Sequence, residues 1–147
     1  MGNCALPKSK DDTSFINSKI HTVLKPSCFK KLNRIGRGGF SLVWKVKNKN
    51  DSNILAMKEM SKARVVFKKC VKSVLNEQRI LSILKHPLLV NMHYAFQTPE
   101  TLYLVMDYME GGDLRYAIGN NGAFSEPEVK FFICCCLSAI ELSLIHI

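Results

Sequence analysis

A glycine-rich segment between two apolar runs constrains the fold of this chain more than any other feature. Gly36, Gly38 and Gly39 fall within four positions, so the backbone there can turn sharply and approach another group closely. The flanking runs carry apolar, β-prone residues, which are Phe29, Leu32 and Ile35 before the glycines and Leu42, Val43, Trp44 and Val46 after them. Two strand-like runs joined by glycines predict a β-hairpin with a mobile tip.

A lysine lies on the next strand-like run, which follows a polar turn at 48–53. With the two-residue period of a strand, Ile54, Ala56, Lys58 and Met60 share one face. A lysine on an otherwise apolar face needs a counter-charge or an anionic ligand, because an unpaired buried charge is costly. The plainer alternative is an ordinary hairpin beside a lysine whose long side chain reaches out to water.

A carboxylate that could pair with Lys58 occurs in the segment 61–84, which is predicted to be helical. Glu77 lies inside the apolar stripe of this helix, whose other members are Cys70, Val74, Ile80, Leu81 and Leu84. The solvent-facing side carries Lys72, Asn76 and Arg79. Because a carboxylate inside an apolar stripe needs a partner, the sequence predicts a Lys58–Glu77 ion pair; a structural salt bridge without a ligand is the alternative.

Two more strands and a hinge are predicted after this helix. His86-Pro87 ends the helix, because the residue before a proline is driven out of the helical region. Strands are expected at 88–96 and 101–106, and the alternation in the second predicts a half-buried strand. The chain then runs through Gly111-Gly112 to Asp113, a favourable helix cap, which predicts a hinge between two packed units.

A second capping sequence, Ser125-Glu126-Pro127-Glu128, predicts a helix that continues through Val129 to about Leu142. Residues 131–147 are very apolar, so a transmembrane segment is an alternative. The run is short for a membrane span and is interrupted by Glu141 and His146. These features favour a buried helix of a larger unit, whose apolar face would need a covering partner.

In this order, the motifs resemble the N-terminal lobe of a protein kinase, in which a G-x-G-x-x-G-x-V loop is followed by an A-x-K lysine. The two motifs match at Gly36, Gly38, Val43, Ala56 and Lys58. Ser41 replaces the third glycine of the loop, and Gly39 is an additional one. A dinucleotide-binding turn is disfavoured, because a strand-like run and not a helix follows the glycines.

The resemblance implies an ATP site. In the family the glycine-rich loop covers the phosphates, and a glutamate holds the lysine at the α- and β-phosphates. By this resemblance Met106 is the gatekeeper, Asp107 and Met109 offer backbone groups to adenine, and Asp113 bonds the ribose. The residues implied at the ATP site are Ile35, Gly36, Arg37, Gly38, Gly39, Phe40, Ser41, Val43, Ala56, Lys58, Met106, Asp107, Met109 and Asp113, with Glu77 as the ion-pair partner of the lysine.

The run from His86 to Tyr116 resembles the AGC group of serine/threonine kinases. Its end, Gly111 to Tyr116, resembles the YANK family, whose members also begin with Met-Gly. This implies an ATP-dependent phosphotransferase acting on protein serine or threonine. It also implies an α+β fold in which five antiparallel strands and the helix that the family calls αC precede the first helices of an incomplete C-lobe. The expected divisions are a flexible tail at 1–28, an N-lobe with hinge at 29–109 and the start of a C-lobe at 110–147.

The sequence contains neither a His-Arg-Asp catalytic loop nor an Asp-Phe-Gly motif. In the family these motifs supply the residue that orients the substrate hydroxyl and the side chains that hold Mg²⁺. No residue of this chain is therefore assigned to catalysis or to a metal, and Mg²⁺ is expected only in a full-length parent. Residues after about Glu141 do not match the family's continuation, which suggests a truncated or misassembled coding sequence. A non-catalytic nucleotide- or partner-binding module is the alternative.

The first residues have the pattern of a lipidation site. Gly2 would be exposed by removal of the initiator methionine, Cys4 is placed for palmitoylation, and lysines follow. Leu6 stands where the pattern prefers Ser or Thr, and a frayed tail is the alternative. The expected location is cytoplasmic, with acylation as the route to the inner face of the membrane.

Charge and cysteine usage agree with this location. The net charge of +9, from 21 basic and 12 acidic residues, suits an anionic ligand or a membrane surface, and no motif indicates nucleic-acid binding. The six cysteines lack metal-ligand spacing, and consecutive Cys134, Cys135 and Cys136 would point in different directions on a helix. Reduced thiols in a cytosolic protein are expected.

Overall fold

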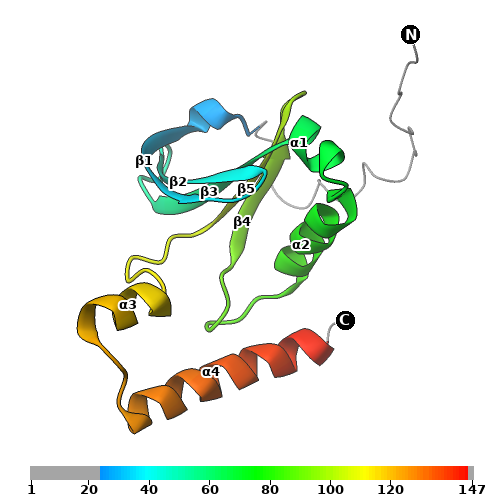
Figure 1. Cartoon of the computed structure of the whole chain (residues 1–147). Coiled ribbons are helices and arrows are strands. Elements are labelled where there is room, and N and C mark those ends of the chain that lie inside the picture. The colour runs from blue at the N-terminus through cyan, green and yellow to red at the C-terminus, as the bar shows by residue number, and fades with distance from the viewer. Residues whose placement is uncertain (1–23, 146–147) are drawn as a thin grey trace.

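The computed structural model describes residues 24–145, and the elements follow one another as predicted for an α+β fold (Figure 1). A short 3₁₀ turn at Pro26–Cys28 leads into the first strand. The strands and helices are β1 (Phe29–Arg37), β2 (Ser41–Asn48), β3 (Ile54–Ser61), α1 (Lys62–Phe67), α2 (Val71–Ile83), β4 (Met92–Gln97), β5 (Thr101–Asp107), α3 (Leu114–Asn121) and α4 (Glu126–Ile145). The lipidation candidates Gly2 and Cys4 lie outside the described residues.

The five strands form one antiparallel sheet in the order β1-β2-β3-β5-β4, as expected. One row of directly opposed residues crosses the whole sheet: Gly36, Val43, Lys58, Leu104 and Ala95. Two residues further along β2, a second row of opposed residues consists of Lys45, Ala56, Met106 and Met92. Opposed residues share a face, and so do residues two apart in one strand, so both rows lie on the same side of the sheet.

Apolar residues pack on both faces of this sheet. On one face, aromatic and aliphatic side chains form a buried cluster: Phe29, Val46, Leu55, Met57, Tyr103 and Val105. On the other face, strand residues pack with residues of α1 and α2 in a second cluster: Met60, Val65, Val74 and Leu104. In Figure 1 α1 and α2 flank the sheet, whereas α3 and α4 lie below it.

The prediction of a half-buried strand at 101–106 is wrong. Tyr103, Leu104 and Val105 are all buried, because β5 is an inner strand whose two faces belong to the two clusters. The alternation of side chains does sort them onto two faces. Both faces are nevertheless covered, one of them by α1 and α2.

The helix predicted over 61–84 is two helices. Lys68, Lys69 and Cys70 separate α1 from α2, and Lys69 has a φ of 54°, in the left-handed region that ends helices. The Cys70 N–H donates to the Val65 carbonyl at 3.0 Å, which closes the turn. Cys70 therefore precedes α2 as its N-cap residue and is not part of the apolar stripe to which it was assigned.

The strand predicted at 88–96 begins later, at Met92. The residues after Pro87 form a turn, in which the Leu89 N–H donates to the His86 carbonyl at 3.0 Å and the Leu88 N–H donates to His86 Nδ1 at 3.2 Å. Leu88 and Val90 in this segment are exposed, so its apolar character reflects neither strand pairing nor burial.

The two capped helices form where their sequences predicted them. Asp113 Oδ1 accepts a hydrogen bond from the Tyr116 N–H at 2.7 Å at the start of α3. Before α4, the Ser125 N–H and Oγ donate to Glu128 Oε2 at 2.8 and 2.7 Å. Several apolar side chains of α4 are exposed: Val129, Phe131, Ile133, Leu137 and Ile140. Within residues 24–145, no helix has the length and apolar character needed to cross a membrane.

Candidate functional site

Lys58 and Glu77 form an ion pair between the sheet and α2. Lys58 Nζ lies 2.5 Å from Glu77 Oε1. The Lys58 side chain is 19% exposed and that of Glu77 is 38% exposed, so the pair is held at the edge of the core and remains open to solvent on one side. A partly desolvated ammonium can bind a further anion, because one carboxylate leaves some of its three donors free.

The glycine-rich segment lies in the same row of the sheet as Lys58. Gly36 is opposed to Val43, and Val43 is opposed to Lys58. A Cβ on Gly36 would lie 3.4 Å from Val43 Cβ, so the two backbones approach closely. Ile35 lies at a register shift of β1 and is 42% exposed. The loop and the lysine therefore come together on one face of the sheet.

The tip of the loop turns within the hairpin. The Gly38 N–H donates to the Ser41 carbonyl at 2.8 Å, and the Phe40 carbonyl accepts from the Ser61 N–H at 3.3 Å. The Phe40 side chain packs against the cluster of the α1–α2 face. A Cβ on Gly39 would come within 2.9 Å of Lys68 Nζ. A second ammonium therefore lies beside the loop, and the sequence patterns did not indicate it.

The apolar part of the site is formed by the second row of the sheet. Ala56 is buried, and its partner in β5 is the implied gatekeeper Met106, which is partly buried against the α1–α2 cluster. Val43 lies on the same face, two residues before the Lys45 that opposes Ala56. These side chains give the Lys58 face of the sheet an apolar surface next to the end of β5.

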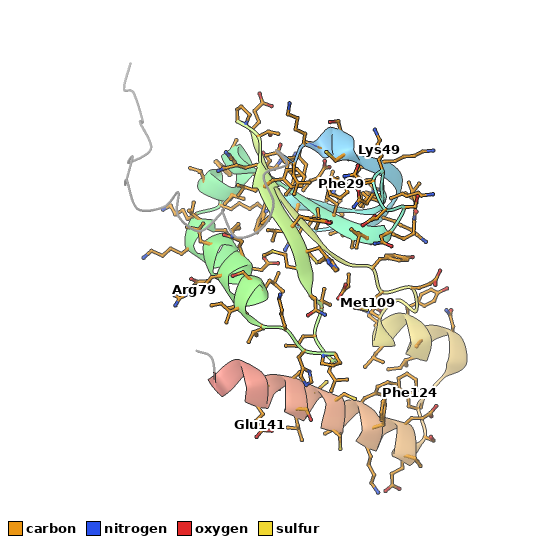
Figure 2. All side chains as sticks on the ribbon, turned by 180° about the vertical axis from the view of Figure 1, so that it is seen from behind. Phe29, Lys49, Arg79, Met109, Phe124 and Glu141 are labelled. Atoms are coloured by element: carbon orange, nitrogen blue, oxygen red, sulfur yellow. The ribbon has the colours of Figure 1, made fainter. Side chains whose placement is uncertain are left out.

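The residues 107–113, which we call the hinge, connect this surface to α3, and Figure 2 shows Met109 in that connection. The Asp107 N–H donates to the Asn91 carbonyl at 3.1 Å, so only its carbonyl is left for a ligand. The Met109 carbonyl accepts from the Gly112 N–H at 3.4 Å. Gly112 has a φ of 77°, which favours glycine at that turn. Asp113, the implied ribose ligand, already uses Oδ1 as the cap of α3.

The Asp107 carboxylate is surrounded by donors. Asn91 contributes its N–H at 2.9 Å and its Nδ2 at 3.0 Å, and His93 Nε2 lies 2.6 Å away. Burial acts to raise the pKa of Asp107, but these hydrogen bonds and the positive charge of His93 together hold it below its ordinary value of 3.8. On the next residue, Lys45 Nζ lies 4.3 Å from the centre of the Tyr108 ring. Sequence periodicity could not reveal these contacts, because they join separate strands.

The described region also contains a groove away from these residues. It has a volume of about 570 Å³ and lies between α2 and the strands β4 and β5. None of the residues implied at the ATP site lines it. Within residues 24–145, no three His, Cys, Asp or Glu side chains lie together as a metal site would require.

Comparison with known proteins gives a consistent result. Residues 29–146 match the protein kinase domain. The chain is 42% identical over 113 residues to Protein kinase 2 of Dictyostelium discoideum, covering 77% of this chain and 24% of that protein. It is 34% identical over 131 residues to the serine/threonine-protein kinase Sgk1 of Danio rerio, covering 88% and 30%. It is 39% identical over 113 residues to the human serine/threonine-protein kinase 32B, covering 77% and 27%. The chain thus spans less than a third of the length of these relatives.

Proposed function

This chain belongs to the protein kinase domain family, and we propose that it forms the ATP-binding part of a serine/threonine kinase that transfers the γ-phosphate of ATP to other proteins. The observation that carries this proposal is the Lys58–Glu77 ion pair in the row of the sheet that continues into the glycine-rich loop. That arrangement puts the Lys58 ammonium next to a backbone segment whose glycines lack Cβ atoms, as phosphate binding requires.

The residues of the site are suited to both the phosphate end and the adenine end of ATP. The phosphate end would meet the loop and the Lys58 ammonium, which Glu77 holds in place. The adenine end would lie against Val43, Ala56 and Met106, with the Asp107 carbonyl and the Met109 N–H at its edge. Asp113 caps α3 through Oδ1, and its other oxygen, Oδ2, can accept from a ribose hydroxyl.

The chemistry of phosphate transfer depends mainly on positioning and on stabilisation of charge. In this chain, Lys58 would neutralise phosphate charge, and the glycine-rich loop would cover the phosphates and exclude water from them. Bound Mg²⁺ supplies the rest of the charge stabilisation in this family. Because the sequence has no His-Arg-Asp or Asp-Phe-Gly motif, we propose phosphate transfer for the longer protein and nucleotide binding without transfer for the 147-residue chain.

The test is the Lys58→Met variant, which removes the ammonium and keeps an unbranched side chain. Titration with a fluorescent ATP analogue should show at least about tenfold weaker binding, since charge-assisted contacts contribute about 1.5–3 kcal/mol. Lys72→Met is the matched control, because Lys72 is exposed on α2. Unchanged affinity with a lower melting temperature would mean that Lys58 is only structural, and would favour a non-catalytic partner-binding module.

Within the family, we propose the AGC group, and within it a relative of YANK kinases. The AGC assignment is supported by the similarity to Sgk1 proteins. The YANK assignment rests on the sequence Gly111-Gly112-Asp113-Leu114-Arg115-Tyr116 and on the Met-Gly start. The sequence of the longer protein tests this assignment.

We also propose that the protein is cytoplasmic and reaches the membrane through acylation of Gly2 and Cys4. One acyl chain anchors a protein only weakly, so both positions matter. Metabolic labelling with myristate should mark the wild-type protein and leave Gly2→Ala unmarked, while Cys4→Ala keeps the myristate and loses membrane retention. A wild-type protein that takes up no myristate would remove this proposal.

A further inference from the structure

We infer that the hinge is held from two sides by residues outside the ATP-site motifs, and that these residues set the preference for adenine over guanine. Lys45 holds it from β2, and His93 of β4 holds it together with Asn91, the residue just before β4. The inference rests on the proposed nucleotide-binding function and adds positioning residues to it. Each contact below lies at the two consecutive residues, Asp107 and Tyr108, that precede the Met109 N–H.

On the β4 side, Asp107 is fixed through both its backbone and its side chain. Its N–H donates to the Asn91 carbonyl at 3.1 Å, and its carboxylate receives the Asn91 N–H at 2.9 Å and Asn91 Nδ2 at 3.0 Å. His93 Nε2 adds a contact of 2.6 Å. Because the backbone and the side chain of Asp107 are both bonded to one segment, the direction of its carbonyl is restricted.

A change of register in β4 brings His93 into this cluster. Met92 opposes Met106 and Tyr94 opposes Val105, so His93 is the extra residue of a β-bulge. A bulge redirects a side chain that would otherwise follow the strand alternation. Here the redirected imidazole reaches the last residue of β5, where the sheet ends and the hinge begins.

On the β2 side, the contact is a cation–π interaction. Lys45 opposes Ala56 in β3, and Lys45 Nζ lies 4.3 Å from the centre of the Tyr108 ring. The ring is partly buried, which strengthens the attraction relative to a fully exposed pair. β2 and β4 are separated in the sheet by β3 and β5. Two consecutive hinge residues are therefore tied to strands on opposite sides.

These ties act on the part of the hinge that would read the base. Adenine presents an amino donor where guanine presents a carbonyl acceptor. A hinge carbonyl held in one direction accepts from the amino group of adenine and is repelled by the carbonyl of guanine. A hinge carbonyl that can rotate discriminates less well between the two bases. Holding the carbonyl in place before the ligand arrives also lowers the entropic cost of binding. The first effect predicts a change in selectivity between ATP and GTP, and the second predicts a change in the affinity for ATP.

The experiment measures dissociation constants for ATP and GTP with the purified full chain and with three variants at Lys45 and Lys47. Lys45→Met should weaken ATP binding by about two- to five-fold, the size of a cation–π contact, and change GTP binding less, so that selectivity falls. Lys45→Arg should restore it, because guanidinium also stacks on aromatic rings. Lys47→Met is the matched control, since it removes the same charge two residues along the same face.

The β4 side is tested by His93→Gln, which keeps a hydrogen-bond donor and removes the imidazole ring. It should also lower the ATP/GTP selectivity. Hydrogen exchange of the Asp107 amide, which donates to the Asn91 carbonyl, should quicken in both His93→Gln and Lys45→Met. Variants that keep the wild-type selectivity while their melting temperatures fall would overturn the inference and leave the proposed function intact. Wild-type protein that binds neither nucleotide would overturn the proposed function and this inference together.

Discussion

Ser41 Oγ occupies the space that a Cβ atom on Gly38 would need: the two positions are only 2.6 Å apart. Ser41 is also the residue that departs from the three-glycine pattern of the loop. The departure therefore makes Gly38 more necessary, because the serine side chain fills space beside it. None of the three loop glycines has a positive φ, so their role is to leave room and not to permit an unusual backbone.

This contact predicts a coupling between the two positions. Gly38→Ala should force Ser41 out of its rotamer and lower the free energy of unfolding by about 1 kcal/mol. In a Ser41→Ala background the same substitution should be nearly neutral, because Ser41 Cβ lies 3.9 Å from the new methyl group. Urea unfolding of the wild type, the two single variants and the double variant gives the coupling as a double-mutant cycle. Additive effects would contradict the assignment of the clash to Ser41 Oγ.

The Lys58–Glu77 pair should respond to removal of one charge. Glu77→Gln keeps the size of the side chain and a hydrogen-bond acceptor, but leaves the Lys58 ammonium without a counter-charge. We expect the free energy of unfolding to fall by about 1 kcal/mol, since the pair is partly exposed. Chemical denaturation at low and high salt provides the measurement, and the loss should shrink as salt rises. Glu100→Gln, in the exposed turn before β5, is the control and should leave the free energy of unfolding unchanged at both low and high salt.

The lowered pKa of Asp107 predicts a pH-dependent contribution to stability. A carboxyl whose folded pKa is lower than its unfolded value stabilises the fold above the unfolded pKa and loses this effect as pH falls through the folded pKa. Asp107→Asn should therefore be less stable than wild type at neutral pH, and the difference should close on acidification below about pH 4. Unfolding midpoints at stepped pH measure this. A difference that stays constant down to acid pH would show that the charge of Asp107 is irrelevant.

Glu59 should stabilise the face of the sheet that is opposite α1 and α2 through two partners. Its Oε2 accepts from Trp44 Nε1 at 2.6 Å, and its Oε1 lies 2.5 Å from Lys31 Nζ. Glu59→Leu should lower the free energy of unfolding by about 1–3 kcal/mol, because it leaves the part-buried indole N–H without an acceptor. Trp44 is the single tryptophan of the chain, so its fluorescence reports both the local change and the unfolding. Glu59→Gln, which keeps an acceptor, should retain most of the stability, and an equal loss in both variants would contradict this explanation.

Local patterns predicted much of the fold and the main polar contact. Glycines between β-prone runs indicate a hairpin wherever they occur, and the position of Glu77 in an apolar helical stripe required a cation. The break between α1 and α2 could not be predicted in this way, because the left-handed residue is Lys69 and not a glycine or asparagine. The burial of both faces of β5 depends on its place inside the sheet, which periodicity does not contain.

The contacts that surround the hinge were missed for a related reason. In the sequence, Lys45 on β2 looks like an ordinary exposed strand lysine. Its role at the hinge depends on its contact with Tyr108, which is far along the chain. His93 reads as one member of an alternating strand until the bulge shifts it toward Asp107. Pair contacts between distant segments follow from register, and register is set by the whole sheet.

The strand order β1-β2-β3-β5-β4 also has a consequence for the synthesis of this protein. The first three strands are consecutive and can pair as soon as they leave the ribosome. β4 emerges before β5, yet β5 is the strand to which it pairs. The growing chain must therefore carry the unpaired edge of β3, and β4 without a neighbour, until about forty-six further residues beyond Ser61 have been made and β5 ends at Asp107. Closure of that long loop should limit the folding rate, and it makes the nascent sheet a natural substrate for chaperones.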